Sequence, residues 1–214
     1  HPYYPESLVL DGYVEPTQSP LQLVLAIGGA LALVLLASYA LLFARKASPR
    51  LRPSERAVCM WFVLCGSLHC VFELHYLLHF TTIQASTDLL SSMWKEYAKS
   101  DSRYLAQVPL VFALESITVC FVGPLCWLTV HHIHTNAPLR HVCQLAVSLL
   151  HVYSVVLYYG TEFVSAESSC RPEPLYYYGY FIAMNAPWLV VPLCLAIASA
   201  RELCRGMAAA RRAT

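Results

Sequence analysis

The sequence predicts an all-α, polytopic membrane protein with five transmembrane helices that enclose an intramembrane pocket. Of its 214 residues, 57% are hydrophobic and only 13% are charged, about half the charged share of a typical soluble domain. Residues 21–44 carry no charged side chain and exceed the roughly 20 apolar residues that cross a bilayer. Four more long apolar stretches follow, so the composition argues against a water-soluble domain.

The first apolar stretch, residues 21–44, is expected to be a transmembrane helix. A signal peptide is disfavoured because no basic region precedes the stretch and because it is too long. In lipid every backbone group must find a partner within the segment, which favours helices for the later stretches too. The four later spans are expected at about 56–80, 109–131, 139–163 and 175–200, in a single domain, 1–214, with a long loop at 81–108.

The basic residues predict an orientation. Ten of the 14 lysines and arginines fall in the first loop, the third loop and the C-terminal segment. Cytoplasmic loops carry the excess of basic residues, so the C-terminus is expected in the cytoplasm and the 81–108 loop in the lumen. The basic residues of the first loop are Arg45, Lys46, Arg50, Arg52 and Arg56.

Net charge and cysteines exclude other classes of protein. A net charge of +1 gives no reason to expect a nucleic-acid partner. The nine cysteines show no metal or redox spacing, and most fall in apolar stretches, where a thiol behaves as a small hydrophobe. A disulfide framework is therefore not expected.

Several polar side chains interrupt the apolar stretches. A charged group at mid-helix costs at least about 2.5–3.5 kcal/mol and usually faces a partner or a cavity. Because such groups occur in four of the spans, they predict a shared internal pocket. They are His69, Glu73, His75, His79, Glu115, Thr118, His151 and Asn185.

Helical phase divides the second span into two sets. Glu73 lies one turn after His69, about 40° round the helix, so these two side chains can hydrogen-bond. His75 and His79 lie about 120° or more away and nearer the helix end, where they are expected to reach the membrane interface. For Glu115 and Asn185, the alternative of a hydrogen bond that only joins neighbouring helices stays open. The tyrosines of residues 175–181 favour an aromatic belt.

A metal site is a separate alternative. His75 and His79 are spaced to chelate zinc or iron, with a third ligand from His131, His132 or His134. The spacing lacks a full metal signature, so neither a metal nor a cofactor is expected. Chelator insensitivity would exclude a metal-dependent enzyme.

The remaining polar groups form an acid–base set. A carboxyl in an apolar cavity tends to keep its proton, so Glu73 or Glu115 can act as an acid, and the His69–Glu73 pair can act as a base. Asn185 can orient a substrate, and the ring of Trp188 attracts a cation. Together they are competent for double-bond isomerisation through a carbocation.

Five segments carry a resemblance to a known family. The strings "HPYYPESLVLDGYV", "HCVFE" (69–73), "SMWKEYAKSDSRY" (92–104), "LESIT" (114–118) and "MNAPWLVVP" (184–192) occur in order along most of the chain. They resemble the emopamil-binding-protein family of sterol Δ8–Δ7 isomerases, which are EXPERA-type membrane proteins. The resemblance implies five helices in the endoplasmic reticulum membrane, a homodimer, and inhibition by cationic amphiphilic drugs.

The resemblance also implies a reaction and the residues for it. A sterol ring double bond would move from C8=C9 to C7=C8 by protonation and deprotonation. The implied pocket residues are His69, Glu73 and Glu115 for catalysis, with Thr118, Asn185, Trp188 and Tyr104 for substrate binding and cation stabilisation. Two alternatives stay open: a non-catalytic sterol- or amine-binding protein of the same fold, and an isomerase of another triterpenoid.

Overall fold

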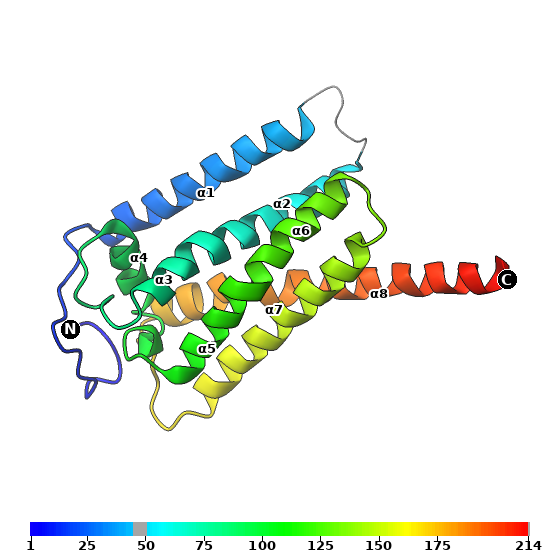
Figure 1. Cartoon of the computed structure of the whole chain (residues 1–214). Coiled ribbons are helices and arrows are strands. Elements are labelled where there is room, and N and C mark those ends of the chain that lie inside the picture. Colours follow the sequence, from blue (N-terminus) through cyan, green and yellow to red (C-terminus); the bar gives the residue numbers. More distant parts are fainter. Residues whose placement is uncertain (45–50, 214) are drawn as a thin grey trace.

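The computed structural model describes residues 1–44 and 51–213, and within these residues it is a bundle of helices without strands (Figure 1). Its helices are α1 (Pro20–Phe43), α2 (Pro53–Ser67), α3 (Leu74–Leu78), α4 (Leu89–Tyr97), α5 (Pro109–Ile117), α6 (Gly123–His134), α7 (Arg140–Phe163) and α8 (Pro187–Ala213). A short 3-10 turn spans Ser102–Tyr104.

Five helical runs are long and apolar enough to cross a membrane, which confirms the predicted fold class. They cover Pro20–Phe43, Pro53–Leu78, Pro109–His134, Arg140–Phe163 and Leu175–Ala213. The last run is longer than expected, because α8 continues through a polar segment to Ala213 and its end projects beyond the other helices (Figure 1).

Three of the five runs contain π-helical segments, at Leu68–Glu73, Thr118–Val122 and Leu175–Ala183. A π-helical turn takes an extra residue, and such turns occur often at functional sites. The first joins α2 to α3, the second joins α5 to α6, and the third precedes α8. The first contains both His69 and Glu73.

Helix α1 shows how the sequence sets its own ends. The Ser19 side chain accepts from the Gln22 amide while the Gln22 side chain accepts from the Ser19 amide, and Pro20 occupies the first turn. Only Leu23 and Phe43 are buried along α1, and the helix lies at the edge of the bundle (Figure 1). Its apolar outer face suits lipid. The expected first-loop residues Arg45, Lys46 and Arg50 lie outside the described residues.

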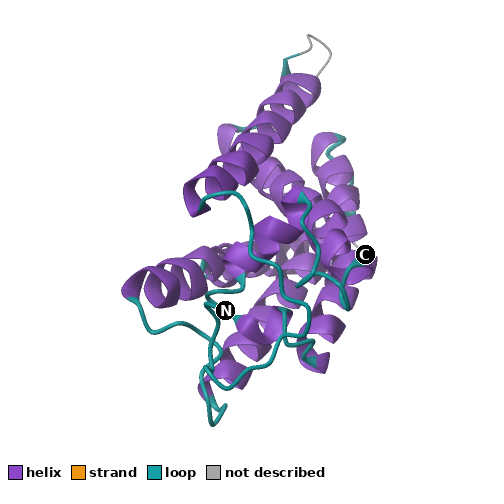
Figure 2. Ribbon diagram, turned by 90° about the vertical axis from the view of Figure 1, so that its left-hand side faces the viewer, coloured by secondary structure: helices purple, strands orange, loops and turns teal. Residues whose placement is uncertain are grey.

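The 81–108 loop is folded rather than extended. It contains α4 and the 3-10 turn, and Trp94, Lys95 and Tyr104 within it are buried. The N-terminal segment covers it: the Tyr3 hydroxyl donates to the Lys95 carbonyl at 3.0 Å, and Lys95 Nζ donates to the Val14 carbonyl at 2.6 Å. Figure 2 looks at this end of the bundle, where the loop segments gather.

Candidate active site

His69 and Glu73 form the expected pair on the first π-helical segment. His69 Nδ1 lies 2.8 Å from each of the two Glu73 carboxyl oxygens, and the His69 side chain is buried. In a π-helix about 4.4 residues make a turn, so two residues four apart still share a face. The predicted one-turn contact is therefore present, on a helix type that the sequence does not reveal.

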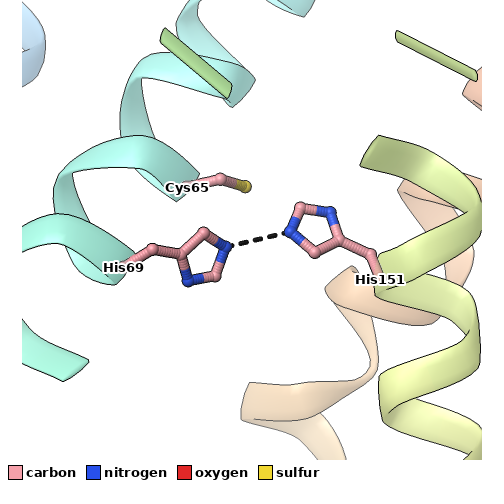
Figure 3. Close-up of side chains that lie close together, drawn as sticks. All are labelled: Cys65, His69 and His151. Carbon is pink, nitrogen blue, oxygen red and sulfur yellow. Dashed lines mark hydrogen bonds between the residues drawn. The ribbon is translucent and has the colours of Figure 1, made fainter. Parts of the chain in front are cut away.

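His151 of α7 meets His69 from the opposite side. The two Nε2 atoms are 2.9 Å apart, and both rings are buried. Figure 3 shows the two imidazoles pointing toward one another from different helices, with the Cys65 thiol beside them. Sequence reasoning placed His151 among the polar residues of the spans but gave it no role. Its position in the middle of an apolar helix is the signal that marked it.

Glu115 brings the second carboxyl to the same place. It is buried on α5, and its carboxyl group interacts with that of Glu73. Two neighbouring carboxylates repel each other when both are ionised, so the pair favours the state in which one of them holds a proton. One acid and one base therefore stand side by side, next to His69.

Tyr104 fixes Glu115 from the folded loop. Its hydroxyl donates to Glu115 Oε1 at 2.9 Å. Burial, together with the neighbouring Glu115 charge, raises the pKa of the Tyr104 phenol well above its usual value, so the phenol keeps its proton and acts as a donor. The ring is held by aromatic neighbours, with centroids 4.8 Å from Trp94 and 5.2 Å from Tyr76.

Asn185 ties the fifth span to the same loop. Its Nδ2 donates to the Phe181 carbonyl at 2.8 Å, and its Oδ1 accepts from the Tyr97 hydroxyl at 3.2 Å. The Tyr97 hydroxyl is also 3.3 Å from that of Tyr158 on α7. The Tyr97 ring lies 5.5 Å from the Tyr104 ring, so Asn185 connects to the carboxyl pair through two tyrosines.

Trp188 and Thr118 are less directly connected. The Trp188 ring packs on Trp61, with centroids 5.3 Å apart, and its indole lies near the Cys65 thiol beside His69. The Thr118 hydroxyl donates to the Leu114 carbonyl of its own helix at 2.6 Å. In this structure, then, Thr118 makes its side-chain hydrogen bond within its helix.

The predicted split between the histidines of the second span is present. The rings of His75 and His79 stack on each other at 4.0 Å, and His75 Nε2 bonds the Ser91 hydroxyl at 2.9 Å. These side chains therefore face the loop and each other, separately from His69.

The three-ligand metal set considered from the sequence does not assemble. His131, His132 and His134 end α6 at the far end of the bundle from α3 (Figure 1). A different group, Cys65, His69 and His151, has its possible ligand atoms within 4.8 Å of one another. This is a set that sequence reasoning missed, because its members come from separate helices.

A hollow of about 320 Å³ lies between α1 and α6. Among its lining residues are Leu41, Trp127 and His134. The carboxyl pair and His69 do not line it, so it is separate from the acid–base set.

Comparison with known proteins gives concordant matches. The model of the EBP family, described as EXPERA (expanded EBP superfamily), matches residues 89–199. The chain is 35% identical over 207 residues to the 3-beta-hydroxysteroid-Delta(8),Delta(7)-isomerase of Mus musculus, covering 95% of this chain and 88% of the relative.

Plant relatives match over similar lengths. A probable 3-beta-hydroxysteroid-Delta(8),Delta(7)-isomerase of Oryza sativa is 31% identical, covering 95% of this chain and 92% of the relative. A protoglabretal synthase of Ailanthus altissima is 29% identical, covering 92% of this chain and 89% of the relative.

Proposed function

Since the chain belongs to the EXPERA, or expanded EBP, superfamily, we propose that it is a sterol Δ8–Δ7 isomerase. This enzyme moves a ring double bond from C8=C9 to C7=C8. The observation that carries the proposal is the set of Glu115, Glu73 and His69. His69 contacts both Glu73 oxygens, the two carboxyl groups interact, and Glu115 and His69 are buried. The isomerase names of relatives that match nearly the whole chain support the same reaction.

The reaction needs one acid and one base on a substrate without polar groups at the reacting carbons. The carboxyl that holds the shared proton, Glu73 or Glu115, delivers it to C9, and the π electrons of C8=C9 form the new C9–H bond. The cation is then at C8. The remaining carboxylate, with His69 as its partner, takes a proton from C7, and the C7–H electrons form C7=C8.

The same pair of carboxyl groups resets the enzyme. After one turnover the acid has given a proton to C9 and the base has gained one from C7, and the two carboxyl groups interact. A proton can therefore pass back from the base to the acid without any added reactant. This supports a cycle in which no cofactor takes part.

The other proposed residues bind the substrate and stabilise the cation. The Trp188 ring lies next to Cys65 and the His69 turn, and an indole face attracts a cation such as that at C8. Asn185, Tyr104 and Thr118 hold the walls of the substrate site. A cationic amphiphilic amine would resemble the cation and is expected to inhibit.

The presence of the entire acid–base set favours catalysis over binding alone. The alternative of a non-catalytic sterol- or amine-binding protein predicts loss of this set. An isomerase of another triterpenoid has support in triterpenoid synthases of Ailanthus altissima and Citrus sinensis that are 29–30% identical to this chain, and sterol profiling separates it from the leading proposal.

The location, orientation and assembly are also part of the proposal. The chain is a multi-pass membrane protein, and we place it in the endoplasmic reticulum as a homodimer, with a cytoplasmic C-terminus and residues 81–108 in the lumen. Glycosylation acceptor sites inserted within 81–108 are expected to be modified. An acceptor tag added after the C-terminus is expected to stay unmodified, and the reverse pattern contradicts the orientation.

The decisive experiment is expression in cells that lack sterol Δ8–Δ7 isomerase, followed by sterol profiling. Wild-type protein should convert accumulated Δ8-sterols to Δ7-sterols, and in heavy water the product should carry deuterium at C9. Persistent Δ8-sterols in spite of good expression contradict the proposal. Conversion of a different triterpenoid by the purified protein, without Δ8-sterol turnover, assigns the alternative substrate.

A further inference from the structure

The contact between His69 and His151 determines where the hydrogens of both rings lie. His69 Nδ1 is 2.8 Å from both Glu73 oxygens. When Glu73 is the ionised member of the carboxyl pair, it accepts hydrogen bonds but does not donate. The hydrogen of neutral His69 is therefore on Nδ1, and Nε2 carries a lone pair. That lone pair is 2.9 Å from His151 Nε2, so His151 must carry its hydrogen on Nε2 and donate it to His69.

His151 is positioned to do this and makes no other side-chain hydrogen bond. Its ring is only 3% exposed, and its Nδ1 atom makes no hydrogen bond with any described residue. Burying the polar ring of His151 costs free energy unless its Nε2 atom makes the hydrogen bond with His69. The sole side-chain partner of His151 in the described structure is thus the histidine of the acid–base set.

We propose that His151 is a positioning residue for the isomerase: it holds His69 in the Nδ1–H form that donates to Glu73. The inference rests on the proposed function, with Glu115 as the acid and Glu73 as the base. Without the His151 donor, the Nε2 lone pair of His69 is buried and has no partner. Turning the His69 ring, or moving its hydrogen to Nε2, would then lower the free energy. Either change removes the hydrogen bond that keeps Glu73 a carboxylate able to accept a proton from C7.

The same atoms invite a metal interpretation, which the distances disfavour. Two nitrogens bound to a tetrahedral zinc at about 2.0–2.1 Å lie roughly 3.3 Å apart. The Nε2 atoms of His69 and His151 are 2.9 Å apart, which is the length of an ordinary hydrogen bond between nitrogens. The Cys65 thiol completes the possible ligand group.

The first test compares two substitutions at one position. His151→Gln keeps a side-chain N–H that can reach His69 Nε2, whereas His151→Leu fills the space without a donor. We expect His151→Leu to lower kcat by about 10²-fold with little change in KM, and His151→Gln to restore most of kcat. Ser148→Ala is the matched control: Ser148 is buried on the same helix, one turn before His151, and its hydroxyl has no partner in the described structure.

The second test reads the ring directly and does not require turnover. The ¹⁵N shifts of labelled histidine distinguish an Nδ1–H ring from an Nε2–H ring, and His69→Gln identifies the signals of His69. We expect His69 to be Nδ1–H in the wild type and in His151→Gln, and to lose that state in His151→Leu.

Three outcomes overturn the proposal: equal kcat for wild type and His151→Leu, an Nε2–H form of His69 in the wild type, or stoichiometric zinc in purified protein that His151→Gln releases. A wild type that shows the Nδ1–H form but no turnover of Δ8-sterols contradicts the proposed function, and leaves the assignment of His151 to His69 supported.

Discussion

The Tyr104 hydroxyl donates a 2.9 Å hydrogen bond to the Glu115 carboxyl. It joins a residue of the folded loop to a residue of the third membrane run, and both side chains are buried. The loop therefore forms part of the candidate active site and determines which oxygen of Glu115 is left for Glu73. Tyr104 belongs to the string "SMWKEYAKSDSRY", whose loop position gives no hint of this contact.

Replacing Tyr104 by phenylalanine is expected to lower turnover about tenfold. The change leaves the ring in its aromatic cluster but removes the donor to a buried oxygen, which costs about 1–3 kcal/mol. Part of that cost falls on the arrangement of the carboxyl pair, so kcat should drop more than thermal stability. The measurements are Δ8-sterol turnover and the melting temperature in detergent.

Tyr76 provides the matched control for that experiment. Its ring lies in the same aromatic cluster, 5.2 Å from Tyr104, and its buried hydroxyl has no hydrogen-bond partner in the described structure. Tyr76→Phe should therefore leave turnover unchanged. If both phenylalanine variants lose activity equally, the effect comes from packing and the role given to the Tyr104 hydroxyl is wrong.

Glu73→Gln and Glu115→Gln should each reduce turnover by about 10²- to 10⁴-fold, the usual contribution of a general acid or base. Glutamine keeps the size and much of the hydrogen bonding but can neither deliver nor accept the proton. Deuterium incorporation at C9 should fall in parallel. Glu202→Gln is the control, since Glu202 pairs with Arg205 on the exposed end of α8. Full turnover in both active-site variants would rule out the mechanism.

Gly123→Ala is expected to disturb His69 without replacing any acid–base residue. A Cβ on Gly123 would lie 2.7 Å from the Cys70 sulfur and 3.0 Å from His69 Cβ. The first distance is closer than real Cβ atoms approach and the second is very tight, so Cys70 and His69 must move away. We expect a lower melting temperature and a marked loss of turnover.

The control for that substitution is Gly160→Ala on α7, where an added Cβ meets nothing within 4 Å. Alanine favours helix over glycine by about 1 kcal/mol, so Gly160→Ala should leave stability equal or raised and turnover unchanged. Equal behaviour of the two alanine variants would show that the close approach of Gly123 to His69 does not position the site.

Helical phase predicted the pairing of His69 with Glu73, because residues four apart in one helix lie on the same face. The same reasoning could not predict the π-helical turn beneath them, since an extra residue in a turn leaves no trace in apolar periodicity. It also could not pair His151 with His69, which come from different spans. Such contacts depend on how helices rotate and cross, and a single sequence does not fix these.

The folded loop shows a second limit of the sequence. Apolar length located the five membrane runs, but the 81–108 segment has too mixed a pattern to predict burial. In the structure the Lys95 side chain of this segment is buried, and two backbone carbonyls accept hydrogen bonds from it. Lys95 Nζ lies 2.6 Å from the Val14 oxygen and 2.7 Å from the Ser86 oxygen. A charge becomes tolerable in an interior once hydrogen bonds replace water, and those partners come from segments far apart in the chain.

Lys95→Met should consequently detach the N-terminal segment from the loop. Methionine matches the length of the lysine stem but leaves the Val14 and Ser86 carbonyls without this donor, and hydrogen bonds to charged groups contribute about 1.5–3 kcal/mol each. We expect a clear fall in melting temperature and faster proteolysis within residues 1–19. Arg205→Met is the control, because Arg205 pairs with Glu202 on the exposed end of α8, where an ion pair contributes only about 0–1 kcal/mol. Since α4 also carries Tyr97, the partner of Asn185, Lys95→Met should lower turnover along with stability. An N-terminal segment that resists protease as well in Lys95→Met as in wild type would mean that Tyr3 and the other contacts hold it without the lysine.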